Sequence, residues 1–257
     1  MEKGTVKRSV KLYTLIILVL LYIAVISFPF SLLVNDTVAT ILDMVLKAMF
    51  LVVAFISIKK YQLSELRFLP SKNAKLLLLI PLLVLTFSNW IYIWIFRSPL
   101  NSSIDGGALT LTLFSTLITV FCEELLFREV MHDCLKEFIK QDYLRILIAA
   151  TIFALLHFLN LFYGVDFLMV LAQVGYAFIL GLVLGLIKEK GAGIIAFVSF
   201  HFLFNAFNND LFSILYKGEW NANFVIINVI IGACVVGYGI LMYFLIKPKV
   251  PQQIPEA

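Results

Sequence analysis

The sequence predicts an all-α, polytopic integral membrane protein with about eight transmembrane helices. Of its 257 residues, 62% are hydrophobic and 14% are charged, and the mean hydropathy is +1.01. A soluble domain usually has about a quarter of its residues charged, because it must cover its surface. The apolar stretches are continuous and long enough to cross a bilayer as helices, unlike the short alternating strands of a membrane barrel.

Eight apolar windows are expected to be the membrane spans. They are 12–34, 38–58, 74–96, 108–130, 144–163, 168–187, 192–209 and 223–246. The first window is longer than the apolar core of a signal peptide and no A-x-A site follows it, so we expect a retained span. No pair of windows forms an internal repeat, and a single membrane domain is expected over residues 1–257.

Orientation follows from the lysines and arginines. With the N-terminus inside, 17 of the 20 basic residues fall on the inner side, two fall in outer loops, and Lys47 lies within the second window. The positive-inside rule therefore predicts that both termini are cytoplasmic. The net charge of +4 is ordinary for such a protein and gives no reason to expect nucleic acid as a partner.

The second window contains two opposite charges, Asp43 and Lys47. They are four residues apart, so they share a helical face and can neutralise each other. We expect this pair to be structural.

The fourth window ends in the motif EExxxR, formed by Glu123, Glu124 and Arg128. A charge near the bilayer centre costs about 2.5–3.5 kcal/mol on insertion scales, so each such residue needs an explanation. Glu124 and Arg128 lie one turn apart and can form an ion pair. Glu123 points about 100° away from Glu124 and lacks that partner.

Two further polar motifs lie in the fifth and seventh windows. FxxxH places Phe153 and His157 one turn apart, and HxxxN does the same for His201 and Asn205. The third histidine, His132, falls in the charged inner stretch and is expected to be solvated. Two of the three histidines therefore lie deep in apolar spans. Together with the two glutamates, they predict one shared polar site.

The depth of the site sets a condition on the fourth helix. Counted from the cytoplasmic ends of their windows, His157, His201 and Asn205 all lie near the middle of the bilayer. Glu123 would be too shallow if its helix stopped at Arg128. We therefore expect this helix to continue through His132, as far as Lys140.

EExxxR, FxxxH and HxxxN on successive membrane helices resemble the motifs of the CAAX protease and bacteriocin-processing (Abi) family of intramembrane glutamic-type proteases. The resemblance covers roughly residues 115–210, which would form the catalytic motif core. It implies an eight-helix fold and hydrolysis of peptide bonds without a metal or other cofactor. By this analogy Glu123 and His157 would activate water, His201 and Asn205 would hold the oxyanion, and Glu124 and Arg128 would support the site.

The chemistry of these side chains agrees with that implication. Amide hydrolysis needs a group that accepts a proton from water and donors aimed at the developing oxyanion. The same glutamate and two histidines could instead bind zinc and leave one position open for water. However, HExxH is absent and the histidines come from separate helices, so the metal-independent mechanism is favoured.

The substrate is expected to be a peptide or protein in the lipid bilayer. The resemblance allows a prenylated CAAX protein, a bacteriocin or pheromone precursor, or bacteriocin self-immunity. Short loops suit a small bacterial cell-membrane protein, which favours peptide processing or immunity. Alternatives are a non-catalytic immunity protein and a small-solute transporter, although the two repeated halves with broken helices that are common in transporters do not occur. The glycines of the sixth window (Gly175, Gly181 and Gly185) indicate close helix packing.

Overall fold

The structure is a computed structural model that describes residues 2–72, 86–97 and 104–216. It also describes the single positions 76, 83, 100, 230, 233, 234, 237, 238, 240 and 241. The helices of this part are α1 (Glu2–Ile26), α2 (Asp36–Tyr61), α4 (Ser88–Phe96), α5 (Gly106–Glu123), α6 (His132–Leu135), α7 (Asp142–Leu156), α8 (Phe167–Glu189), α9 (Ile194–Asn205) and α10 (Leu211–Leu215). Shorter 3₁₀-helices are η1 (Phe30–Leu32) and η4 (His157–Tyr163), and two π-helices are η3 (Glu124–Met131) and η5 (Ala206–Asp210).

The chain is an integral membrane protein, and its all-helical class is confirmed. Within the described residues, five helices are long and apolar enough to cross a membrane, and they match the first, second, fourth, fifth and sixth expected spans. The seventh expected span contains the shorter apolar helix Ile194–Asn208. Most of the eighth span and much of the third lie outside the described residues, so the number of eight stays a prediction. The cytoplasmic side of the termini also stays a prediction, because the helices alone do not show which side of a membrane they face.

Polar residues stop the spans where the sequence indicates a break. Asn35 caps α2, because its side chain accepts a hydrogen bond from the backbone N–H of Val38. Asp105 caps α5 in the same way. Between η4 and α8, Gly164 has a φ of 76° and Asp166 caps α8. Residues with a Cβ atom rarely adopt the left-handed backbone of Gly164, and apolar side chains cannot accept the hydrogen bonds that Asn35, Asp105 and Asp166 accept.

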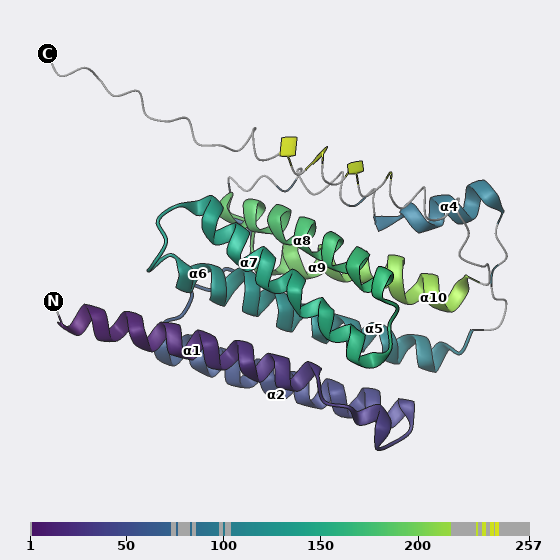
Figure 1. Cartoon of the computed structure of the whole chain (residues 1–257), viewed down its shortest axis with the longest axis horizontal. Helices are drawn as coiled ribbons and strands as arrows, with labels where there is room; N and C mark the ends of the chain where they lie inside the picture. Colours follow the sequence, from purple (N-terminus) through teal and green to yellow (C-terminus); the bar gives the residue numbers. More distant parts are fainter. Residues whose placement is uncertain are drawn as a thin grey trace, which may run out of the picture.

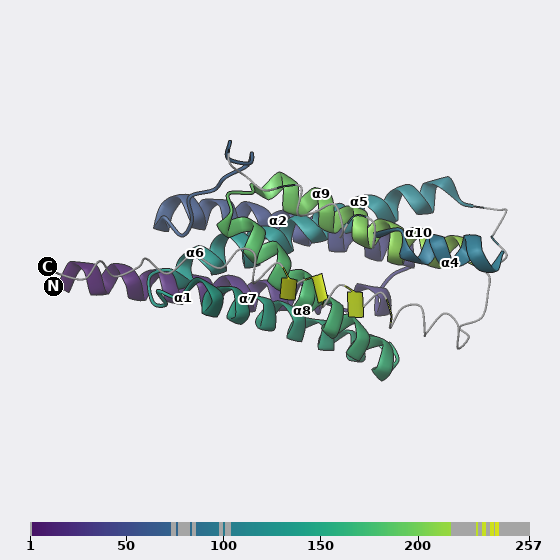
Figure 2. The ribbon, with the colours of Figure 1, turned by 90° about the horizontal axis from the view of Figure 1, so that it is seen from above.

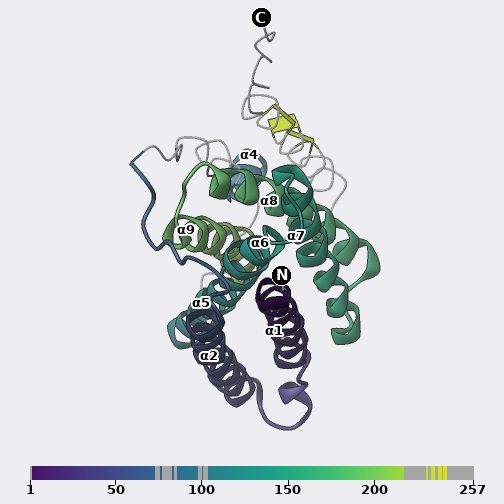
Figure 3. The same cartoon turned by 90° about the vertical axis from the view of Figure 1, so that its left-hand side faces the viewer.

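A continuous helix formed by α5, η3 and α6 lies at the centre of the bundle. Seen end-on, the α1–α2 pair, α9 and the α7–α8 pair surround it (Figure 3). Its side chains Leu125, Phe127 and Val130 are fully buried. The expectation that this helix passes Arg128 and His132 is confirmed, and the helix ends at Leu135, before Lys140.

The predicted Asp43–Lys47 pair is confirmed. The Lys47 Nζ lies 2.6 Å from Asp43 Oδ2 and donates a second hydrogen bond, 2.9 Å long, to Thr119 Oγ1 on α5. The pair therefore also joins α2 to the central helix, beside which α1 and α2 run (Figure 1).

Close contact between α7 and α8 depends on two of the three glycines expected to pack there. A Cβ atom added at Gly181 would lie 2.9 Å from Ala150 Cβ and 3.0 Å from its Cα, and one at Gly185 would lie 2.8 Å from Ile146 Cγ2. At Gly175 no atom lies within 4 Å of such a Cβ, so that glycine is not a packing residue.

We expect Gly181→Ala to lower the free energy of unfolding by about 1–3 kcal/mol, because the backbone of α7 must move to admit the methyl group. Gly175→Ala, the matched control on the same helix, should raise the free energy of unfolding by about 0.5–1 kcal/mol. Detergent-induced unfolding measures both values. Equal effects of the two changes would contradict this packing.

Residues 63–72, here called the strap, follow α2 in the sequence and form backbone hydrogen bonds with the start of α9. The backbone N–H of Ile194 donates to Arg67 O at 2.8 Å, and that of Ile195 donates to Phe68 O at 3.3 Å. A Cβ atom at Gly193 would lie 2.5 Å from Phe68 O, so only glycine allows this approach. The strap carbonyls thus satisfy the first N–H groups of α9, and Figure 2 shows the strap crossing to that helix.

Candidate active site

Three motif residues lie at junctions where an α-helix continues as a π-helix or a 3₁₀-helix. Glu123 is the last residue of α5 before η3, and Asn205 is the last residue of α9 before η5. His157 begins the 3₁₀-helix η4 after α7. Such π segments inside α-helices frequently occur at functional sites.

Glu124 and Arg128 form the ion pair that their spacing predicts. Arg128 Nε lies 3.2 Å from Glu124 Oε2, and their side chains are 3% and 0% exposed. The guanidinium also lies over the ring of Phe153 on α7, 4.2 Å from its centroid, which is a cation–π geometry. The pair is therefore fully enclosed between the central helix and α7.

His201 contacts both glutamates of the motif. Its Nδ1 lies 2.7 Å from Glu124 Oε1, and its Nε2 lies 3.8 Å from Glu123 Oε2. A carboxylate beside Arg128 can only accept, so Nδ1 carries a proton and donates it to Glu124. This leaves Nε2 as the atom that faces Glu123. The contact between Glu124 and His201 was not predicted, because the sequence already gave Glu124 a partner in Arg128.

His157 lies beside the same aromatic ring as His201. Its ring meets that of Phe153 edge-on with centroids 5.1 Å apart, which confirms the expected neighbours of FxxxH. The ring of Phe153 also meets His201, at 5.9 Å. His157 Nδ1 lies 3.2 Å from the backbone oxygen of Phe153, so it donates there and Nε2 keeps a lone pair.

Asn205 lies four residues after His201 in the same α-helix. The two side chains therefore share one face, as HxxxN predicts. Asn205 is half-buried, and it has interactions of its own.

The prediction that His132 is solvated is wrong. Its side chain is 2% exposed, and its Nε2 lies 3.1 Å from Glu189 Oε1 at the end of α8. Arg145 on α7 binds the same oxygen at 3.1 Å and donates to the carbonyls of Ile139 and Lys140. The start of the charged stretch is buried because the central helix continues through it to Leu135, whereas Lys136 and Lys140 beyond it are exposed.

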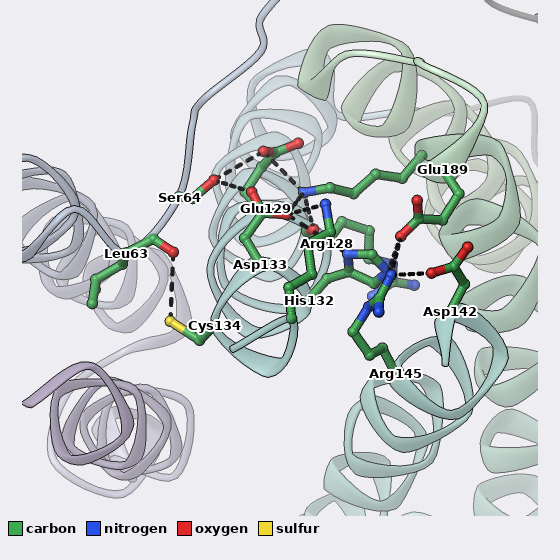
Figure 4. A network of polar contacts seen from close by, with 12 residues as sticks. Leu63, Ser64, Arg128, Glu129, His132, Asp133, Cys134, Asp142, Arg145 and Glu189 are labelled. Atoms are coloured by element: carbon green, nitrogen blue, oxygen red, sulfur yellow. Dashed lines mark hydrogen bonds and ion pairs between the residues drawn. The ribbon is translucent and has the colours of Figure 1, made fainter. Parts of the chain in front are cut away.

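Figure 4 shows the wider network around His132. Lys188 on α8 lies 3.1 Å from Glu129 Oε2 and 3.3 Å from Asp133 Oδ1, both on the central helix. Ser64 of the strap donates to Asp133 Oδ2 at 2.6 Å. The network joins α7, α8 and the strap to the helix that carries Glu123, and so fixes its position.

Residues 105–207 match the family model described as Rce1-like, type II CAAX prenyl endopeptidase. The motif-bearing segment is Rce1-like. This confirms the family recognised from the three motifs and supports a membrane peptidase. No curated protein matches the chain.

One contact to Glu123 comes from outside the Rce1-like segment. Tyr22 on α1 donates from its hydroxyl to Glu123 Oε1 at 3.1 Å. Its ring is 1% exposed and lies 5.2 Å from that of Phe50 and 6.3 Å from that of Phe127. Tyr22 was not predicted as a site residue. Its position in the middle of an apolar window was nevertheless a signal, because a buried tyrosine hydroxyl needs a hydrogen-bond acceptor.

We expect Tyr22→Phe to lower kcat about tenfold with little change in KM, because a hydrogen bond to a charged group is lost while the ring stays packed. Tyr163→Phe is the matched control, since Tyr163 donates only to the backbone oxygen of Ile26, at 2.8 Å. A rate unchanged by Tyr22→Phe would show that the hydroxyl does not hold Glu123 for catalysis.

The zinc alternative would need several ligand side chains grouped around one point. Among the residues that the structure describes, no three His, Cys, Asp or Glu side chains are grouped so that they could hold one metal ion. His201 has one ring nitrogen engaged by Glu124, so only Nε2 could bind a metal.

Proposed function

We propose that the chain is an intramembrane peptidase that hydrolyses a peptide bond with water activated by Glu123. The proposal rests above all on the contact of His201 with both glutamates, which joins EExxxR and HxxxN into one site. The Rce1-like match of residues 105–207 gives it a reaction class.

In this proposal Glu123 is the general base and His157 orients the water. Tyr22 occupies Oε1 of the carboxylate, so Oε2 is the oxygen that faces the site and accepts the proton. The proton then passes from Glu123 to the leaving amine, which completes hydrolysis of the C–N bond.

His201 and Asn205 would stabilise the tetrahedral intermediate. Because Nδ1 of His201 already donates to Glu124, donation from Nε2 to the oxyanion requires the doubly protonated ring. Glu124 and Glu123 flank that positive charge, and Arg128 holds Glu124 in place. Asn205 supplies a second N–H from the same helical face.

The proposed substrate is a peptide or protein that reaches the site through the bilayer, and the proposed setting is bacterial peptide processing or bacteriocin immunity. The first test uses the purified full chain in lipid vesicles with a prenylated CAAX peptide and its unprenylated form. Cleavage of either supports a peptidase, and the ratio of the two rates reports whether the prenyl group is recognised.

The same assay separates the mechanisms. Activity that survives a chelator supports the glutamate mechanism, whereas activity lost to a chelator and restored by zinc would overturn it. Immunity or processing in cells that survives both Glu123→Ala and His157→Ala, with the protein still inserted, would mean that binding alone is the function.

A further inference from the structure

An open surface pocket, here called the cavity, lies between the ends of α1 and α2, away from the proposed active site. It has a volume of about 260 Å³ and is lined by Lys7, Val10, Lys60, Tyr61 and Gln62. A water molecule occupies about 30 Å³ in the liquid, so the cavity can hold a much larger group.

Two lysines border this cavity from different helices. Lys7 Nζ donates to Gln62 Oε1 at 3.0 Å, so the side chain reaches from α1 to the end of α2. Lys60 Nζ lies 5.2 Å from the centroid of the Tyr61 ring. Both ammonium groups are exposed, and within the described chain neither forms an ion pair.

The nearby charge is also positive in excess. Glu137 is the acidic residue beside the start of α1, and it already binds Lys11 at 2.7 Å and Arg8 at 3.8 Å. The hydrogen bond from Lys11, with the charges of Arg8 and Lys7, holds the pKa of Glu137 below its usual value. Lys7, Arg8 and Lys11 therefore share the carboxylate of Glu137, and Lys60 borders the cavity as a further cation.

The position of the cavity indicates what would bind there. The candidate membrane span of α1 begins at Lys7 and that of α2 ends at Tyr61, so the cavity lies at the boundary of the apolar layer. Lipid headgroups occupy this level, and tyrosine is enriched there. Val10 and the Tyr61 ring offer apolar surface beside the two ammonium groups.

We infer that the cavity binds the headgroup of an anionic phospholipid, with the phosphate between Lys7 and Lys60. Val10 and Tyr61 contact the glycerol and the first carbons of the acyl chains. A bound lipid would neutralise charges on both helices and so stabilise the packing of α1 against α2. This binding is independent of peptidase activity.

The test is native mass spectrometry of the detergent-solubilised full chain, titrated with phosphatidylglycerol or with phosphatidylcholine of the same acyl chains. Lys7→Gln/Lys60→Gln removes two exposed ion pairs to the phosphate and should weaken binding of the first phosphatidylglycerol about 30-fold. Lys72→Gln/Lys140→Gln removes the same charge from exposed positions that do not line the cavity and should bind as the unchanged chain does.

Three results would overturn the inference. They are equal affinity for the two lipids, equal losses in the two double variants, and displacement of the lipid by glycerol phosphate at matched concentration, which would identify a site for free phosphate. Circular dichroism of each variant checks that α1 and α2 remain helical.

Discussion

Glu123→Gln is expected to lower the rate of peptide hydrolysis about 10²–10⁴-fold, the range for loss of a general base. Glutamine keeps the size of the side chain and can still accept the hydrogen bond from Tyr22, but it cannot take a proton from water. The measurement is kcat for a cleaved peptide, with the purified chain in lipid vesicles.

Glu137→Gln is the matched control for this change. Glu137 is a carboxylate that pairs with Lys11 at 2.7 Å, outside the proposed site, so its loss should leave kcat unchanged. An unfolding midpoint for Glu123→Gln close to that of the unchanged chain would show that the loss is chemical. A variant that is folded and fully active would refute the role of Glu123.

The second large effect is expected on stability. Arg128→Ala should lower the free energy of unfolding by about 3–5 kcal/mol, because it removes the cation of a buried ion pair and leaves the Glu124 carboxylate with only its hydrogen bond from His201. Lys136→Ala removes the cation of the Lys136–Asp133 pair, whose lysine is 45% exposed, and should cost less than about 1 kcal/mol. Unfolding in a graded detergent mixture compares the two.

A double change separates the stability of this pair from its role in the site. Glu124→Leu/Arg128→Met removes both charges, so most of the lost stability should return. Activity should stay low, because His201 no longer has an acceptor for Nδ1. Recovery of full activity in this double variant would contradict the proposed support of His201 by Glu124.

Helical spacing was enough to predict the contacts within single motifs. Glu124 with Arg128, Phe153 with His157, and Asp43 with Lys47 each lie four residues apart, and each pair is in contact. The continuous central helix could also be predicted, because Glu123 would otherwise lie too close to the membrane surface. These features depend only on the period of an α-helix and the depth of a bilayer.

Contacts between helices could not be predicted in the same way. The bond of Tyr22 to Glu123 and the burial of His132 depend on which helices are neighbours, and one sequence does not give that information. Likewise, hydrophobic periodicity does not reveal the π-helices after Glu123 and Asn205. His132 was placed in the helix but expected to be solvated, because the sequence does not show that Glu189 of α8 lies beside it.

The strap imposes an order on biosynthesis. The ribosome makes Arg67 and Phe68 long before it makes Ile194 and Ile195. The backbone oxygens of the first two residues accept hydrogen bonds from the N–H groups of the last two. The acceptors for the first N–H groups of α9 therefore already exist when α9 is synthesised. The helix that carries His201 and Asn205 does not depend on any later segment of the chain for these hydrogen bonds.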